Sequence, residues 1–183
     1  AVGITEVTLT VTDPRGESDS CTTTVTVIDE IAPVITLNGG DIVLECGVDS
    51  YAELGASAAD NCGVDGDITI TGSVTDAPGV YEIAYNVSDV NGNAATTVVR
   101  TVTVQDTLPP TVTCPADITL ECNDATDTTP ANTGSATGTD ICSGVDISFS
   151  DILTPGCGGS YTITRTWTAT DGAGLTDTCV QKI

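Results

Sequence analysis

The chain has 183 residues and carries 26 acidic but only 4 basic side chains, which gives a formal net charge of −22 at pH 7. This charge argues against a nucleic-acid groove or an anionic membrane surface, because both need clustered Lys or Arg. The absence of His excludes a Ser-His-Asp or Cys-His pair within the chain and any His metal ligand. No stretch approaches ~18 consecutive apolar residues, so we expect no membrane insertion.

The composition nevertheless favours a folded protein over a disordered acidic tail. Apolar residues make up 39%, and many are Val and Ile interleaved with Thr, which is typical of half-buried strands. The eight cysteines lack the Cys-x-x-Cys spacing of a zinc site, so disulfides in an oxidising, extracellular setting are the better interpretation. No basic and apolar leader opens the chain, so we expect a mature protein or a segment excised from a longer one.

The elements predicted first along the chain are two alternating runs joined by a Gly-containing turn, within residues 1–29. The first run ends with Leu-Thr-Val-Thr-Asp at residues 9–13, and the second spans residues 22–28. Similar strand ends recur at residues 85–89 and 167–171, each followed by a Gly-containing turn. We therefore interpret residues 1–29 as the C-terminal part of a truncated repeat.

Residues 30–106 are predicted to form one complete repeat of short strands separated by Gly, Asn, Asp and Pro turns. No window has a convincing helical period, so an all-β sandwich is favoured. A unit of ~77 residues is small for a self-sufficient core, so disulfides or ions should help to stabilise it. The predicted strands span residues 34–37, 42–45, 56–59, 68–74, 80–88 and 95–104.

Residues 107–183 are predicted to form a second, nearly complete domain, because they repeat the pattern of the first. The segment Asp-Ile-Thr-Leu-Glu-Cys at 117–122 matches Asp-Ile-Val-Leu-Glu-Cys at 41–46. Asp-Ile-Cys at 140–142 likewise matches Asp-Asn-Cys at 60–62. Self-similarity of this kind indicates a tandem array.

Several of these motifs resemble known repeats. The Leu-Glu-Cys strand, the Asp-Asn-Cys-Gly-Val-Asp-Gly-Asp loop at 60–67 and the Asp-x-x-Gly-Asn turn at 89–93 resemble bacterial immunoglobulin-like repeats. Residues 114–122 and 161–167 resemble hyalin-type repeats. The resemblance implies immunoglobulin-like β-sandwich domains in a linear array, of the kind found in giant surface proteins of Bacteroidetes.

The acidic residues of the complete repeat are expected to converge at one pole of the sandwich. There the linker, the 60–67 loop and the 89–93 turn should meet, and so many carboxylates repel one another unless a cation lies among them. Calcium takes six to eight hard oxygen ligands, whereas magnesium prefers to keep its waters. We therefore expect a structural Ca²⁺ ion between domains. The candidate ligands are Asp29, Glu30, Asp60, Asp65, Asp67, Asp89, Asn91 and Asn93.

The next junction repeats this construction with fewer ligands, so we expect a weaker or altered calcium site there, or none. Its candidates are Asp106, Asp140, Asp146 and Asp171. An alternative explanation stays open for both sets, because Asp and Asn are common in turns where they bond their own backbone. A charge excess can also serve solubility.

The cysteines recur at equivalent positions of the two repeats, which suggests Cys46–Cys62 and Cys122–Cys142 disulfides. Cys114 and Cys179 suggest a third disulfide between the first and last strands of the second domain. Cys21 is the equivalent of Cys179, so its partner should lie in the missing half-repeat, and Cys157 has no evident partner. Connectivity does not follow from sequence alone.

The leading functional hypothesis is a non-enzymatic segment of a long extracellular or cell-surface protein, acting as a stalk, filament or adhesin. Disulfides would cross-link the segment, and interdomain calcium would make it rigid. Its partners would be neighbouring repeats, with possible lateral association into fibres or contact with surface glycans or proteins. The alternative is a carbohydrate-binding accessory or spacer module of a secreted hydrolase. Tyr81, Tyr85, Tyr161 and Trp167 are the residues that could stack on sugars, although Tyr85 and Trp167 share the repeat position of Leu9, which favours packing.

Overall fold

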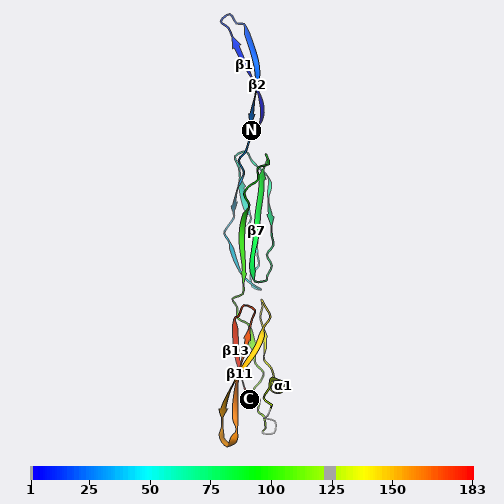
Figure 1. Ribbon diagram of the computed structural model, residues 1–183, viewed down its shortest axis with the longest axis vertical. Helices are drawn as coiled ribbons and strands as arrows, with labels where there is room; N and C mark the ends of the chain where they lie inside the picture. Colours follow the sequence, from blue (N-terminus) through cyan, green and yellow to red (C-terminus); the bar gives the residue numbers. More distant parts are fainter. Residues whose placement is uncertain (1, 122–126) are drawn as a thin grey trace. The chain divides into compact units, whose positions relative to one another are not determined.

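The computed structural model describes residues 2–121 and 127–183, and their regular secondary structure is almost entirely β-strand (Figure 1). The chain divides into two compact units. The first holds the described residues of 1–42, 52–74 and 81–102, and the second holds those of 43–51, 75–80 and 103–183. The second unit therefore includes the segments 43–51, 75–80 and 103–106 of the preceding sequence repeat.

The strands up to the linker at residue 106 follow the alternation in the sequence. They are β1 Gly3–Thr12, β2 Ser18–Val27, β3 Val34–Leu37, β4 Ile42–Glu45, β5 Ala56–Ala59, β6 Val64–Thr71, β7 Gly79–Asp89 and β8 Val98–Gln105. The elements that follow are β9 Thr111–Thr113, α1 Pro130–Thr133, β10 Thr137–Thr139, β11 Asp146–Pro155, the 3₁₀ turn η1 Cys157–Gly159, β12 Tyr161–Thr170 and β13 Thr176–Lys182.

The first two strands form an antiparallel hairpin with Leu9 opposite Cys21. Every residue of β1 and β2 is exposed, so the hairpin has no core of its own. Its register repeats that of β12 and β13, where Trp167 lies opposite Cys179. The hairpin therefore pairs its two strands as β12 and β13 do, and its assignment to the end of a truncated repeat stays a prediction.

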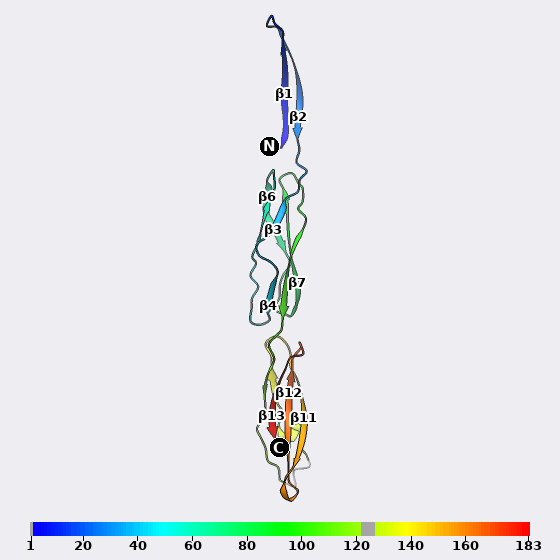
Figure 2. The ribbon, with the colours of Figure 1, turned by 90° about the vertical axis from the view of Figure 1, so that its left-hand side faces the viewer.

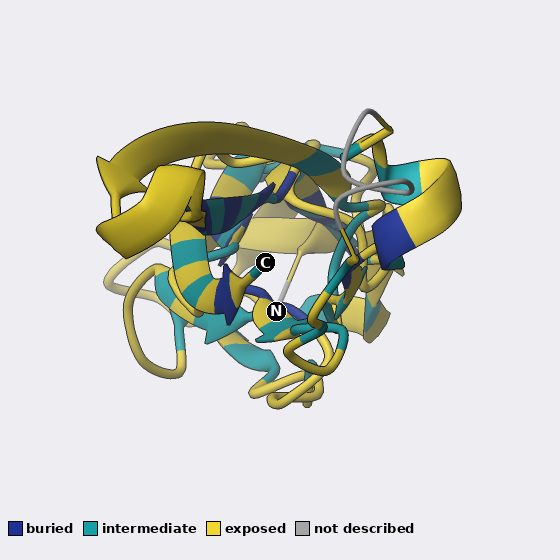
Figure 3. Ribbon diagram, turned by 90° about the horizontal axis from the view of Figure 1, so that it is seen from below, coloured by how far each residue is buried: buried dark blue, intermediate teal, exposed yellow. Residues whose placement is uncertain are grey.

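The 30–106 repeat contains a two-stranded sheet, β3-β5, and a four-stranded sheet in the order β4-β8-β7-β6. Figure 2 shows β3, β4, β6 and β7 within this body. The strand β7 alternates buried and more exposed residues along its length, and Ile83, Tyr85 and Val87 are buried. Such alternation is typical of a strand with one face turned to a core. In Figure 3, bands of buried and more exposed residues alternate along several strands.

A buried arginine organises the core of each repeat. Arg100 of β8 is fully buried, and it pairs with Glu53 at 2.8 Å and donates to the carbonyls of Asn38 and Gly55. Its guanidinium also lies 5.4 Å from the ring centroid of Tyr85. Because those two carbonyls belong to residues flanking β3 and β5, the guanidinium ties the small sheet to the large one.

The second repeat is built on the sheets β9-β10 and β11-β12-β13. Arg165 of β12 is 1% exposed and forms a two-bond ion pair with Asp151. Its guanidinium lies 4.3 Å from the Phe149 ring centroid and 5.6 Å from that of Trp167. The sequence analysis identified neither arginine, because an isolated Arg in a strand carries no signal that it points inward.

The structure confirms the all-β fold with immunoglobulin-like sandwiches and moves several predicted boundaries. The strand predicted at 68–74 is β6, Val64–Thr71, because Val64 and Asp65 already pair with the end of β7, and a register shift follows Asp65. The strand predicted at 95–104 begins at Val98. One four-residue helix, α1, also forms where Pro130 begins a helical turn. The domain boundaries at 29 and 106 remain predictions.

Candidate metal centres

Each acidic turn uses one carboxylate oxygen to bind its own backbone. Oδ1 of Asp89 accepts the N–H groups of Asn91 and Asn93 at 2.9 and 2.8 Å. Oδ1 of Asp171 accepts those of Ala173 and Leu175 at 2.9 and 2.8 Å. Asp and Asn commonly bond their own backbone in turns, which is the alternative explanation given for these residues in the sequence. This bonding occupies one oxygen of each carboxylate and leaves the other for further partners.

Three carboxylates from the linker and two turns meet in the first unit, and we call them the Asp29 cluster. One oxygen each from Asp29, Asp60 and Asp89 lies within 4.8 Å of the others. They come from the linker after β2, the turn after β5 and the end of β7. Asp89 is only 1% exposed, whereas the other two are partly exposed. The convergence follows the topology expected from the sequence.

Amide side chains surround the Asp29 cluster. Nδ2 of Asn91 donates to Oδ2 of Asp29 at 3.0 Å, and Nδ2 of Asn93 donates to Oδ2 of Asp89 at 2.6 Å and to the Asp29 carbonyl at 3.1 Å. Loss of solvent acts to raise the pKa of Asp89, but the hydrogen bonds from Asn93, Asn91 and Gly92 outweigh it and leave the pKa below its ordinary value. The cluster is therefore largely satisfied by its own amides.

Three of the predicted ligands do not belong to this group. Glu30, Asp65 and Asp67 are exposed, and none contributes to the group of converging carboxylates in the described part of the chain. Asp65 and Asp67 lie in β6 rather than in a loop. Because the strand extends to Val64, Asp65 pairs with Ser88 of β7, and Asp67 lies in the irregular stretch between Asp65 and Thr69.

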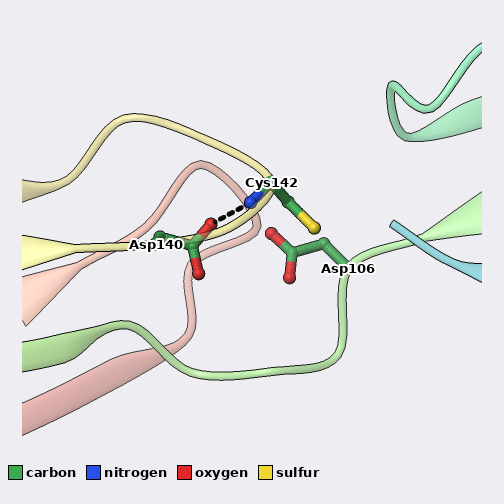
Figure 4. A group of neighbouring side chains, drawn as sticks. All are labelled: Asp106, Asp140 and Cys142. Carbon is green, nitrogen blue, oxygen red and sulfur yellow. Dashed lines mark hydrogen bonds between the residues drawn. The ribbon is translucent and has the colours of Figure 1, made fainter. Parts of the chain in front are cut away.

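The second group lies in the second unit, and we call it the Asp106 cluster: Asp106, Asp140 and Asp171. Figure 4 shows Asp106 and Asp140 pointing toward one another beside Cys142. Ligand atoms of Asp106, Asp140 and Cys142 all lie within 4.8 Å. Asp171, which is 7% exposed, is close enough for its charge to raise the pKa of Asp106.

The Asp106 cluster contains carboxylate oxygens without partners. Both oxygens of Asp106 and Oδ2 of Asp171 are buried, and within the described residues none accepts a hydrogen bond of sound geometry. Loss of solvent, followed by the charges of Asp140, Asp171 and Glu45, raises the pKa of Asp106, although the nearby Leu108 N–H offsets part of the rise. A buried carboxylate left in this state is costly unless a cation accompanies it.

The loop that carries Asp140 is held by its own turn. Oδ1 of Asp140 accepts the N–H groups of Cys142 and Ser143, both at 2.8 Å. The Cys142 N–H is the main cause that lowers the pKa of Asp140. Ser143 also accepts the Gly172 N–H at 2.8 Å, which connects this loop to the Asp171 turn. Asp146, the remaining predicted ligand, is exposed at the start of β11 and outside the cluster.

Sequence analysis missed Glu45, which lies near the same cluster. Its two oxygens accept the Thr107 N–H and hydroxyl, each at 2.7 Å. The Thr107 N–H, and then its hydroxyl, lower the pKa of Glu45. The repeated Leu-Glu-Cys motif was the available signal, because a strand end beside a linker places its acidic side chain at the junction.

The disulfides differ from two of the three predicted pairs. Cys114–Cys179 is confirmed, with Cα atoms 5.8 Å apart. Cys46 instead bonds Cys142, with Cα atoms 5.6 Å apart, so the predicted Cys46–Cys62 and Cys122–Cys142 pairs are wrong. Cys122 itself lies outside the described residues.

The reason for this difference is local. The Cys46 N–H donates to the carbonyl of Gln105 at 2.9 Å, so Cys46 lies beside the linker that leads to the second repeat. Cys62 instead follows Asp60 and lies beside Asp29 of the preceding linker. Loss of solvent, and then a hydrogen bond to Asp29 and the charge of Asp29, raise the pKa of the Cys62 thiol. Cys21, Cys62 and Cys157 are free and exposed.

The aromatic residues are divided between core and surface. Tyr85 is fully buried and Trp167 is 3% exposed, so neither presents a face for sugar stacking. Tyr161 is 42% exposed and lines a cavity of about 420 Å³ together with Asp117, Ser160 and Lys182.

The donor set at the two clusters is suited to a hard cation. Carboxylate and amide oxygens are the ligands that calcium prefers, in flexible arrangements of six to eight. The sulfur beside Asp106 belongs to a disulfide, so it offers no thiolate of the kind that soft metals require. Carboxylates that face each other at this distance repel, and a divalent ion between them removes that repulsion.

Residues 35–104 match the family described as "Bacterial surface protein, Ig-like domain". Hyalin from Lytechinus variegatus is 36% identical to this chain over an alignment of 128 residues, and the match covers 64% of the chain. The chain spans 24% of the length of that relative. Both matches agree with the immunoglobulin-like and hyalin-type resemblance of the motifs.

Solved structures give a weaker likeness. A lipoprotein from Bacteroides thetaiotaomicron is 18% identical, with a TM-score of 0.34, over 81% of this chain and 98% of its own. The extracellular domain of Protocadherin GammaB4 is 13% identical, with a TM-score of 0.37, over 98% of this chain and 37% of its own. TM-scores in this range do not establish a shared arrangement.

Among the described residues, no helix is long and apolar enough to cross a membrane.

Proposed function

We propose that this chain is a non-enzymatic structural segment of a long extracellular surface protein, acting as a stalk, filament or adhesin in a tandem array. The matches to a bacterial surface immunoglobulin-like domain and to hyalin support a structural role at a cell surface. The Cys46–Cys142 and Cys114–Cys179 disulfides support an oxidising setting. The equivalence of the β1–β2 hairpin to β12–β13 supports the array.

The array is stabilised by calcium bound at the Asp106 cluster. The observation that carries this proposal is the Asp106 carboxylate, whose two buried oxygens accept no hydrogen bond of sound geometry among the described residues and lie near three other carboxylates. An ion there would be held by Asp106, Asp140 and Asp171. It would supply the positive charge that the described side chains around these oxygens do not provide.

The Asp29 cluster is proposed as a second, weaker calcium site. Its carboxylates already accept hydrogen bonds from Asn91 and Asn93, so binding an ion there must replace existing bonds. The Asp106 cluster is thus proposed to bind calcium more tightly than the Asp29 cluster, which is the reverse of the sequence-based expectation. That expectation counted candidate ligands, whereas affinity depends on how many of them lack another partner.

The mechanical consequence follows from where the ligands lie. Asp106 belongs to the linker after β8, whereas Asp140 and Asp171 belong to turns of the second repeat. A linker between small domains is mobile by default. An ion bound by the linker and both turns would restrict its backbone, so each junction would become stiffer when calcium is present.

The test is thermal unfolding of the 183-residue chain in calcium and in chelator, monitored by the fluorescence of the single tryptophan, Trp167. At a free calcium concentration 100 times Kd, binding stabilises the folded state by about 2.7 kcal/mol. For a domain of this size each kcal/mol changes Tm by about 4–8 °C, so Tm should rise by about 10–20 °C. Asp106→Asn should lose most of this rise.

Asp67→Asn is the matched control, because Asp67 is an exposed carboxylate outside both clusters. This variant should keep the full rise in Tm, and magnesium at the same concentration should give a smaller one. A wild-type Tm that does not respond to calcium, or an Asp106→Asn variant that responds fully, would rule out the site. Small-angle scattering with and without chelator then tests stiffening separately from binding.

The carbohydrate-binding alternative retains one observation, the cavity lined by the exposed Tyr161. A glycan array would show saturable binding that Tyr161→Ala abolishes if the chain were an accessory module of a hydrolase. No binding to any glycan would leave the structural role as the better explanation.

A further inference from the structure

The Cys46–Cys142 disulfide joins two different sequence repeats. Cys46 ends the Leu-Glu-Cys segment of the 30–106 repeat, and Cys142 lies in the acidic loop of the 107–183 repeat, 96 residues later. Both belong to the second compact unit. The bond therefore connects the strand end of one repeat to the loop of the next, across the linker that contains Asp106.

Cys62 occupies in its repeat the position that Cys142 occupies in the next. Both are the third residue of an Asp-x-Cys segment that follows a short strand. The Cys62 N–H donates to Asp60 at 2.7 Å, as the Cys142 N–H donates to Asp140 at 2.8 Å. The residue after each cysteine donates its N–H to the same carboxylate, at 3.2 and 2.8 Å.

The surroundings of the two cysteines also correspond. Cys142 lies beside Asp106 of the linker, and Cys62 lies beside Asp29 of the linker one repeat earlier. The loop around Cys62 thus has the backbone geometry and the acidic neighbours of a loop that bears a disulfide. In this structure Cys62 is nevertheless free and exposed.

Neither Cys46 nor Cys21 suits Cys62 as a partner. Cys46 is bonded to Cys142. Cys21 lies opposite Leu9 in its hairpin, as Cys179 lies opposite Trp167, and Cys179 bonds Cys114. By this correspondence the partner of Cys21 should be a cysteine near the start of a repeat, as Cys114 is, and not a cysteine of an acidic loop.

We propose that Cys62 forms a disulfide with the cysteine that ends a Leu-Glu-Cys strand of another repeat, the bond that Cys142 makes with Cys46. Disulfides of this kind would link successive repeats covalently, one at each junction and beside each acidic cluster. The partner repeat belongs either to the same polypeptide or to a second copy, whose Cys122 has the required sequence. The inference rests on the proposed tandem array, but it does not depend on calcium.

The chemistry is a thiol–disulfide exchange with an oxidised dithiol oxidoreductase of the compartment where the protein matures. Two thiols, one of them Cys62, lose two protons and two electrons as their sulfurs bond. The disulfide of the oxidoreductase takes up both and becomes two thiols.

The test uses the intact protein isolated without reductant, with free thiols alkylated before digestion and peptides identified by mass spectrometry. Cys62 should be found linked to a peptide that contains Leu-Glu-Cys and is not the 41–46 segment. Gel mobility with and without reductant distinguishes the two sources, because only a bond to a second copy doubles the mass. An alkylated Cys62, or a Cys62–Cys46 link, would overturn the proposal.

If the intact protein contained no further repeats, both the proposed tandem array and this inference would be refuted. Further repeats combined with an alkylated Cys62 would refute this inference alone.

In the 183-residue chain, Cys142→Ser should expose Cys46 to alkylation, whereas the control Cys157→Ser should leave Cys46 protected. If Cys46 instead bonds Cys62 in the Cys142→Ser variant, the loop accepts a partner from its own repeat and the proposal is wrong.

Discussion

Replacing Arg165 by methionine should destabilise the second repeat far more than any other loss of a positive charge in that repeat. The guanidinium is 1% exposed and makes four hydrogen bonds: two to Asp151, one to the Thr133 hydroxyl at 3.0 Å and one to the Thr128 carbonyl at 2.7 Å. Methionine keeps much of the apolar contact with Phe149 and Trp167 but supplies none of these donors.

The magnitude follows from what the substitution leaves behind. Breaking a buried ion pair by removing one partner costs about 3–5 kcal/mol, because the other charge stays unpaired. The Asp151 side chain is 33% exposed, so water recovers part of that loss and about 3 kcal/mol is the better figure. At about 4–8 °C per kcal/mol, Tm should fall by about 12–24 °C.

The assay is urea or thermal unfolding followed by the fluorescence of Trp167, which is buried in the same core. Lys182→Met is the matched control, because Lys182 is exposed in the same repeat and a surface substitution usually changes stability by less than about 0.5 kcal/mol. A midpoint for Arg165→Met within about 3 °C of the control would refute the reasoning. It would mean that the four hydrogen bonds merely replace equally good bonds to water.

Two further predictions concern the second disulfide and the acidic cluster. Cys114→Ser should lower the free energy of unfolding by about 4 kcal/mol in the chain-entropy treatment, because the bond closes a loop of 65 residues; urea unfolding of the variant and of the wild type without reductant measures the loss. In chelator, the raised pKa of Asp106 means that the folded state keeps its proton to a higher pH than the unfolded state does. Stability should therefore fall as pH rises from the ordinary carboxyl range through the raised pKa, and Asp106→Asn should remove that component.

Each of these predictions has a distinct opposing result. A Cys114→Ser variant with unchanged Tm would show that the strands it joins are already fixed by packing. A wild-type chain and an Asp106→Asn variant with the same pH dependence in chelator would show that the Asp106 carboxylate is hydrated in the folded state.

The sequence alone predicted the convergence of Asp29, Asp60 and Asp89. Each residue ends a strand or lies in a linker, and antiparallel topology brings such ends to one pole. It did not predict that Asp65 and Asp67 lie apart from them, because the pairing of Val64 with Asp89 depends on where β7 runs in the folded sheet. A strand boundary is set by its neighbour as much as by its own residues.

The amino-acid sequence by itself determined the β-rich class, the repeat and the acidic turns, since these depend on alternation, turn residues and self-similarity along the chain. Only the tertiary structure decided that Cys46 bonds Cys142, that Arg100 and Arg165 are buried, and that the oxygens of Asp106 accept no well-formed hydrogen bond among the described residues. These features depend on which groups from distant segments meet after folding and on how much water remains around them. Neither quantity is encoded in the local pattern of residues.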